Sequence, residues 1–136
     1  MIDKTWISAG NAIFTISNGK GDHYTYKVKR RKVERGEIWF VSLLTGPNNE
    51  TNYTYLGLLN PKTGFVRLTR KSRFLETSTP VRVIRWGLNL LWKGEHLPPG
   101  YGIMHEGRCG RCGRRLTHPE AIRRGYGPEC WEKIAG

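Results

Sequence analysis

His105-Glu-Gly-Arg-Cys-Gly-Arg-Cys-Gly-Arg-Arg115 and, further on, Gly127-Pro-Glu-Cys-Trp131 decide the fold of the C-terminal part of this chain. The two stretches contain all three cysteines, Cys109, Cys112 and Cys130. Two cysteines separated by two residues, each followed by glycine, are typical of a zinc knuckle, a tight turn that offers two thiolates to one metal. The third cysteine follows a glycine, a proline and an acidic residue, which together favour the start of a helix.

A knuckle followed by a ligand on a helix is the arrangement of treble-clef-like zinc ribbons. A closed structural zinc site takes four ligands, so the three cysteines require a histidine. His105 is the favoured candidate, because it would lie at the end of a strand-like segment, Tyr101 to Met104, that leads directly into the knuckle. His118 is the alternative, although it lies beside Pro119, where it is suited to start a helix over residues 119–124. We therefore expect one structural Zn²⁺.

Two other readings of the cysteines compete with zinc. One is a disulfide with a single thiol left over, and the other is a redox-active Cys-x-x-Cys pair. The redox motif usually starts a helix, whereas the glycines and arginines around Cys109 and Cys112 argue against a helix there. A catalytic zinc requires an open coordination position and usually a general base. The spacing favours structural zinc over all three.

The C-terminal sequence also carries a family resemblance. The run from Gly107 to Cys130 resembles the C-terminal signature of a group of small, largely uncharacterised proteins from bacteriophages and mobile elements. The segment from Phe40 to Gly57 is similar to that group as well. The resemblance implies a phage setting and a bound zinc, with no established activity. It also implies His105 as the fourth ligand, because the position of His118 is often not histidine in the group.

Length and composition limit the architecture. A chain of 136 residues forms one domain, or one core with a zinc appendage, and we predict a first unit over residues 1–97 and a zinc-binding module over residues 98–136. No apolar run approaches the roughly 20 residues of a membrane span, and the first residues lack the apolar stretch of a signal peptide. Three cysteines at metal spacing fit a reducing cytoplasm, that of a host cell if a phage encodes the chain.

The sequence predicts an α+β fold. Five strand-like segments, joined by short turns, indicate an antiparallel sheet: 12–17, 23–29, 37–45, 53–59 and 65–69. Residues 30–36 are predicted to be a basic link between two of them. One helix begins near Ser78-Thr79-Pro80 and presents an apolar stripe that should cover one face of the sheet. Gly87 within this helix indicates close packing on the sheet. The zinc ribbon follows.

The net charge of +12 predicts a polyanionic partner. Tyrosines beside lysines and arginines on a small sheet are a usual platform for single-stranded nucleic acid, with bases stacked on rings and phosphates on cations. Tyr24, Tyr26 and Phe65 are further ring candidates, but Tyr24 and Tyr26 alternate with Val28 in a pattern equally suited to the core. The predicted partner-binding residues are Lys27, Lys29, Arg30, Arg31, Lys32, Tyr53, Tyr55, Arg67, Arg70, Lys71, Arg73, Arg108, Arg111, Arg114 and Arg115.

Three functional hypotheses follow, and no catalytic residue is assigned. The first is a phage-type nucleic-acid-binding protein, for DNA or RNA, that acts by phosphate neutralisation and aromatic stacking. The second is an inhibitor of a host defence complex, similar to an anti-CRISPR protein, that docks on a protein or nucleoprotein. The third is a small metal-dependent nuclease that uses His23, His96 or His118. The sequence contains no phosphate loop, no His-Glu-x-x-His pair and no carboxylate cluster, which favours a binder over an enzyme.

Overall fold

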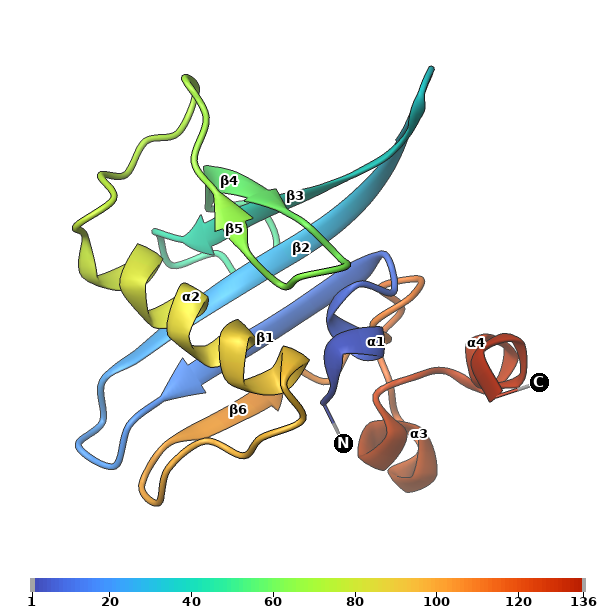
Figure 1. Ribbon diagram of the computed structural model, residues 1–136. Helices are drawn as coiled ribbons and strands as arrows, with labels where there is room; N and C mark the ends of the chain where they lie inside the picture. The colour runs from blue at the N-terminus through green and yellow to red at the C-terminus, as the bar shows by residue number, and fades with distance from the viewer. Residues whose placement is uncertain (1, 136) are drawn as a thin grey trace.

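A twisted antiparallel sheet with one long helix across one face organises the computed structural model, which describes residues 2–135 (Figure 1). The strand order is β5-β4-β3-β2-β1-β6. The predicted α+β class and antiparallel sheet are confirmed, with six strands where about five were expected. The strands are β1 (Asn11–Ser17), β2 (His23–Val33), β3 (Gly36–Leu44), β4 (Tyr53–Leu59), β5 (Val66–Arg67) and β6 (Gly102–His105). The helices are α1 (Lys4–Ile7), α2 (Thr79–Trp92), α3 (Pro119–Arg124) and α4 (Pro128–Ala135).

The core lies between α2 and the sheet. Tyr26 and Val28 of β2 have no exposed surface, and the Tyr26 hydroxyl donates a hydrogen bond of 2.7 Å to the carbonyl of Pro80 at the start of α2. These alternate residues therefore belong to the core face, and Tyr26 is not available for stacking. Lys27, which lies between them, and Lys29, which follows Val28, point to the opposite face, which is called the outer face below.

Helix α2 covers the sheet with the stripe that its sequence predicts. Val81, Ile84 and Leu88 are fully buried, and Pro80 occupies the first turn behind the N-cap Ser78. A Cβ added at Gly87 would lie 2.9 Å from Cδ1 of Ile16 in β1. The glycine thus allows the helix to approach the sheet closely, as its position in an otherwise apolar helix indicates.

The segment expected to be a basic link is instead the end of a long hairpin. Strand β2 continues through Arg31 and Lys32 to Val33, which pairs with Gly36 of β3. Neighbouring strands β1 and β4 end earlier, since Asn11 pairs with Lys29 and Leu59 pairs with Trp39. The hairpin therefore projects from the sheet, as Figure 1 shows. The run of charges misled the prediction, because backbone pairing and an ion pair between Arg30 and Glu37 extend these strands beyond the core.

The sixth strand comes from the segment assigned to the zinc module. β6 pairs antiparallel with β1, and Phe14 lies opposite His105. The predicted boundary before residue 98 therefore separates β6 from the sheet to which it belongs. The strand-like segment ahead of the knuckle was expected, but its partner was not, because pairing between residues so distant in sequence leaves no local pattern.

Trp6 connects the C-terminal segment to the core. Its indole is fully buried and donates a hydrogen bond of 2.7 Å from Nε1 to the carbonyl of Gly125. Gly110 and Gly125 both pack against this ring, and a Cβ at either position would come within 2.4 Å and 2.6 Å of its Nε1. The ring also contacts Phe14 edge-on, at 6.3 Å between centroids. The short helix α1 that carries Trp6 was not predicted.

We expect Trp6→Phe to lower the free energy of unfolding by about 1–3 kcal/mol, because it removes one of the two hydrogen bonds that the Gly125 carbonyl accepts and leaves a gap beside two glycines. The Gly110 amide supplies the other hydrogen bond, at 2.9 Å. Urea unfolding followed by circular dichroism measures this change. Trp86→Phe, at a half-buried position on α2, is the matched control and should have a smaller effect. Equal unfolding midpoints for the two variants would show that Trp6 does not hold the segments together.

Candidate metal centre and cationic sheet face

The three cysteines form one group in the structure. Their sulfur atoms all lie within 4.8 Å of one another, and none of the three is in a disulfide. Thiolates around a tetrahedral zinc ion, with bonds of about 2.3 Å, lie about 3.8 Å apart. The observed spacing is close to that value, so the group is suited to hold a metal ion. The structure contains no disulfide between these cysteines, so the disulfide alternative is not what it shows.

Local hydrogen bonds shape the knuckle. The amide of Cys109 donates to the carbonyl of Arg114 at 2.8 Å, and the amide of Gly113 donates back to the carbonyl of Cys109 at 2.9 Å. The amide of Cys112 points at the Cys109 sulfur at 3.5 Å. Cys130 lies in the first turn of α4, which begins at Pro128 as predicted. The tight turn and the helix start thus bring residues 18 positions apart to one point.

The thiols influence each other's ionisation. Burial opposes ionisation of Cys109, but backbone amides of Cys112, Gly127 and Arg111 donate to its sulfur and hold its pKa below the usual value. Burial and the neighbouring cysteines raise the pKa of Cys112. Arg111 donates from Nη1 to the Cys130 sulfur at 3.5 Å. Three thiolates at this distance repel one another, and a bound cation would relieve that repulsion.

The predicted histidine ligands lie outside this group. Among residues 2–135, the group able to hold a metal consists of the three cysteines, without His105 or His118. The His105 ring accepts a hydrogen bond at Nδ1 from the Gly107 amide at 2.9 Å, and its Nε2 lies 2.6 Å from the Ile122 carbonyl. Both ring nitrogens are therefore engaged, and the ring also packs 5.9 Å from Trp6. His105 connects β6 to α3 in this geometry and does not contact the metal group.

The other histidines occupy separate places. His118 is the N-cap of α3, where its Nδ1 accepts from the Glu120 amide at 3.2 Å. The helix begins at Pro119 and ends before Gly125, whose φ is 80°, as its sequence predicts. His23 begins β2, and His96 follows α2. The structure does not bring these three histidines to one site.

The outer face of the sheet gathers cations and aromatic rings. Lys27, Lys29 and Arg31 recur at every second position of β2 and so point the same way. Lys27 pairs with Ser42, which in turn pairs with Tyr55 of β4, so Tyr55 lies on the same face. The Lys27 ammonium lies 5.3 Å from the centre of the Tyr53 ring. Three of the predicted residues of β2 and both of those of β4 are thus brought together here: Lys27, Lys29, Arg31, Tyr53 and Tyr55.

This face is crowded with positive charge. The pKa of Lys27 is lowered by partial burial and then by the charges of Lys29, Arg108 and Arg31. Arg108 reaches the face from the knuckle and forms an ion pair of 2.7 Å with Glu50 in the β3–β4 loop. Among residues 2–135, Lys27, Lys29 and Arg31 have no ion-pair partner. The knuckle therefore extends the same cationic surface.

The remaining predicted cations divide between this face and other places. Arg67 lies on the outer face, because it pairs with Leu58, which in turn pairs with Phe40 of that face. Arg70, Lys71 and Arg73 are exposed in the loop that follows Arg67. The others lie elsewhere. Arg30, which forms an ion pair of 3.2 Å with Glu37, and Lys32 lie on the opposite side of the hairpin. Arg111 lies against Cys130, and Arg114 and Arg115 are exposed on the knuckle.

Sequence reasoning missed two residues of the outer face. Phe40 was assigned to a buried strand but is half exposed, with its ring 6.3 Å from that of Tyr55. Its neighbours in β3, Val41 and Trp39, are apolar, so alternation was hidden by a nearly continuous apolar run. Glu50 was part of a loop without assigned chemistry. Only the position of Arg108 beside it reveals its role.

Comparison with known protein families gives a match for the C-terminal segment only. Residues 102–135, from β6 through α4, match the model of a family of unknown function (DUF6011). No curated protein and no solved structure matches the chain. The resemblance found in the sequence was likewise to an uncharacterised family, and the phage setting stays a prediction. Among the helices of residues 2–135, none is both long and apolar enough to cross a membrane.

We expect Cys109→Ser and Cys130→Ser to lose bound metal and to unfold the C-terminal segment, because each removes one of three neighbouring thiolates. Metal content after gel filtration, by plasma mass spectrometry, measures the loss. His105→Ala should be less stable but keep its metal, and His118→Ala is the matched control. A folded His105→Ala protein without metal would make His105 a ligand.

Proposed function

We propose that this protein binds nucleic acid through the outer face of its sheet, and that one structural zinc ion stabilises the C-terminal segment. The observation that supports the proposal best is the gathering of Lys27, Lys29, Arg31 and Arg108 on a face that also carries the half-buried rings of Tyr53 and Tyr55. Phosphate neutralisation supplies the main attraction, and stacking on Tyr53 and Tyr55 adds to it. No residue is given a catalytic role.

Electrostatics supports a polyanionic partner. Like charges at every second position of one strand point to the same face and repel one another. The three strand cations Lys27, Lys29 and Arg31 have no ion-pair partner within residues 2–135, so their charges are available to an external polyanion. A nucleic acid places a regular array of phosphates against such a surface and releases its counterions. The sheet supplies a rigid spacing for these contacts.

The zinc proposal rests on the donor set. Three thiolates are soft ligands, which zinc accepts readily in closed structural sites. Cys109, Cys112 and Cys130 would hold the ion, with the knuckle and the start of α4 as the two halves of a treble-clef-like ribbon. The bound ion would tie these two halves together, and Arg111, which already contacts the Cys130 sulfur, would offset the negative charge of the thiolates. The fourth position is not assigned to a residue of this chain.

The two parts of the proposal are connected by Arg108. It precedes Cys109 directly, and its guanidinium donates to the Gly113 carbonyl at 3.2 Å and to Glu50 at 2.7 Å. Its charge also acts on Lys27. A metal that fixes the knuckle would therefore fix one cation of the nucleic-acid-binding face. This gives the zinc ion a structural role in binding without any chemical step.

We expect affinity for nucleic acid to fall steeply with salt, and the triple variant Lys27→Gln, Lys29→Gln, Arg31→Gln to weaken binding and flatten that dependence. Each lost phosphate contact should reduce the slope of log K against log salt by about 0.7–0.9. Fluorescence anisotropy with labelled DNA and RNA, from 50 to 400 mM salt, measures both.

The control variant is Lys20→Gln, Lys62→Gln, Lys93→Gln, which removes the same charge at exposed positions away from the outer face. It should bind almost as the wild type does. Affinity that does not change with salt, or equal losses in the two triple variants, would count against binding by the outer face.

A further inference from the structure

An open cleft lies at the β4 side of the outer face. Its volume is about 710 Å³, and its lining combines two aromatic rings, three cations and one hydroxyl: Phe40, Tyr55, Arg70, Lys71, Ser72 and Arg73. This volume falls within the range of about 300–1,000 Å³ typical of small-ligand sites. The rings come from β3 and β4, and the cations come from the loop after β5. The cleft thus joins an aromatic surface, made of two rings tilted by 59° to each other, to a concentration of positive charge.

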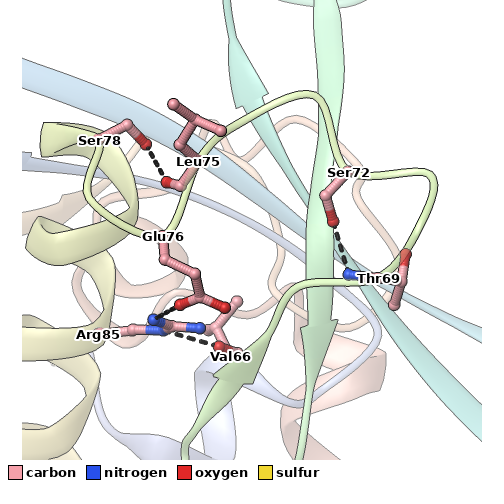
Figure 2. Close-up of polar contacts among 7 residues, drawn as sticks. All are labelled: Val66, Thr69, Ser72, Leu75, Glu76, Ser78 and Arg85. Atoms are coloured by element: carbon pink, nitrogen blue, oxygen red, sulfur yellow. Dashed lines mark hydrogen bonds and ion pairs between the residues drawn. The ribbon is translucent and has the colours of Figure 1, made fainter.

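Hydrogen bonds hold the cationic side of the cleft against its aromatic side. The amide of Ser72 donates to the Thr69 carbonyl at 3.0 Å, which closes a tight turn with Arg70 and Lys71 at its corner. The amide of Thr69 donates back to the Ser72 hydroxyl at 2.8 Å (Figure 2). The Tyr55 hydroxyl lies 2.9 Å from the Thr69 hydroxyl, so a hydrogen bond connects one aromatic side chain of the cleft directly to this turn.

The far end of the loop is fastened to α2. Arg85 donates from Nε to the Val66 carbonyl at 2.9 Å and forms an ion pair with Glu76 (Figure 2). The Ser78 hydroxyl donates to the Leu75 carbonyl at 2.7 Å. The loop is therefore held at both ends, which reduces the entropy lost when its side chains bind a ligand.

The charge of the cleft has no internal partner. Glu76 is the one acidic residue between Val66 and Ser78, and Arg85 already pairs with it. Arg70, Lys71 and Arg73 have no ion-pair partner within residues 2–135, and all three are exposed. A ligand that fits this site must carry negative charge and a flat apolar group. A nucleotide has both.

We infer that this cleft binds one nucleotide unit of a single-stranded nucleic acid, with the base on Phe40 and Tyr55 and the phosphate at Arg70, Lys71 and Arg73. The inference rests on the proposed function and adds the strand form to it. In a duplex each base is stacked and paired, so its face is not available to a ring of the protein. Lys29 lies directly opposite Phe40 in the neighbouring strand. Lys29 and Lys27, on the same face of β2, would therefore contact the phosphates of the adjacent nucleotides.

The experiment separates stacking from charge. Binding of the full chain is measured by anisotropy at one low salt concentration with three labelled probes: a twelve-nucleotide oligothymidine, an abasic strand of the same length, and a duplex of twelve base pairs. We expect the wild type to bind the single strand roughly ten-fold more tightly than the abasic strand or the duplex. Phe40→Leu should abolish most of this preference while leaving affinity for the abasic strand unchanged.

Two triple variants test the cationic side. Arg70→Gln, Lys71→Gln, Arg73→Gln should weaken binding to the oligothymidine at least ten-fold, and more than Lys20→Gln, Lys62→Gln, Lys93→Gln does. Thermal unfolding verifies that each variant is folded. The changed arginines and lysine are exposed, so this variant keeps the test valid if Phe40→Leu is unstable.

The outcomes distinguish the two proposals. Equal affinity of the wild type for oligothymidine, abasic strand and duplex would overturn the nucleotide cleft. It would leave the proposed function intact if the salt titration described above shows that binding weakens steeply with salt. Equal effects of the two triple variants would also overturn the cleft. Binding to none of the probes at low salt would overturn both proposals.

Discussion

The contact between the Trp6 indole and the backbone at Gly110 and Gly125 is the constraint on which the arrangement of the C-terminal segment depends. The ring lies where side chains at either glycine would collide with it, and its nitrogen donates to the Gly125 carbonyl. Gly110 follows the first cysteine of the knuckle, and Gly125 ends α3. One buried side chain near the N-terminus thus positions both halves of the C-terminal segment against the sheet.

This contact explains how the metal group and the cationic face become parts of one surface. β6 pairs with β1 and leads into the knuckle, and His105 at its end bonds to α3. The knuckle then presents Arg108 beside Lys27 and Glu50. A metal ion at the cysteines would act locally, by fixing a turn, but its effect would extend to the outer face because the knuckle is packed on the sheet through Trp6.

The parts of the fold that the sequence predicted are those with a local cause. The turn residues between β1 and β2, the proline at the start of α2, and the left-handed glycine after α3 each determine backbone geometry within a few positions. The metal spacing of the cysteines is equally local within the knuckle. The extent of the β2–β3 hairpin and the helix α1 were missed, because weak local signals there are overridden by pairing and burial.

The sequence by itself determined the three-cysteine group, the antiparallel sheet under α2 and the excess of positive charge, since composition and short-range spacing contain that information. Only the tertiary structure decided which cations share a face, that Phe40 lies half-buried beside Tyr55 on that face, and that His105 bonds to the Ile122 carbonyl and lies apart from the cysteines. The physical reason is that these relations depend on strand register and on contacts between distant segments, where a shift of one residue reverses the face to which every side chain points.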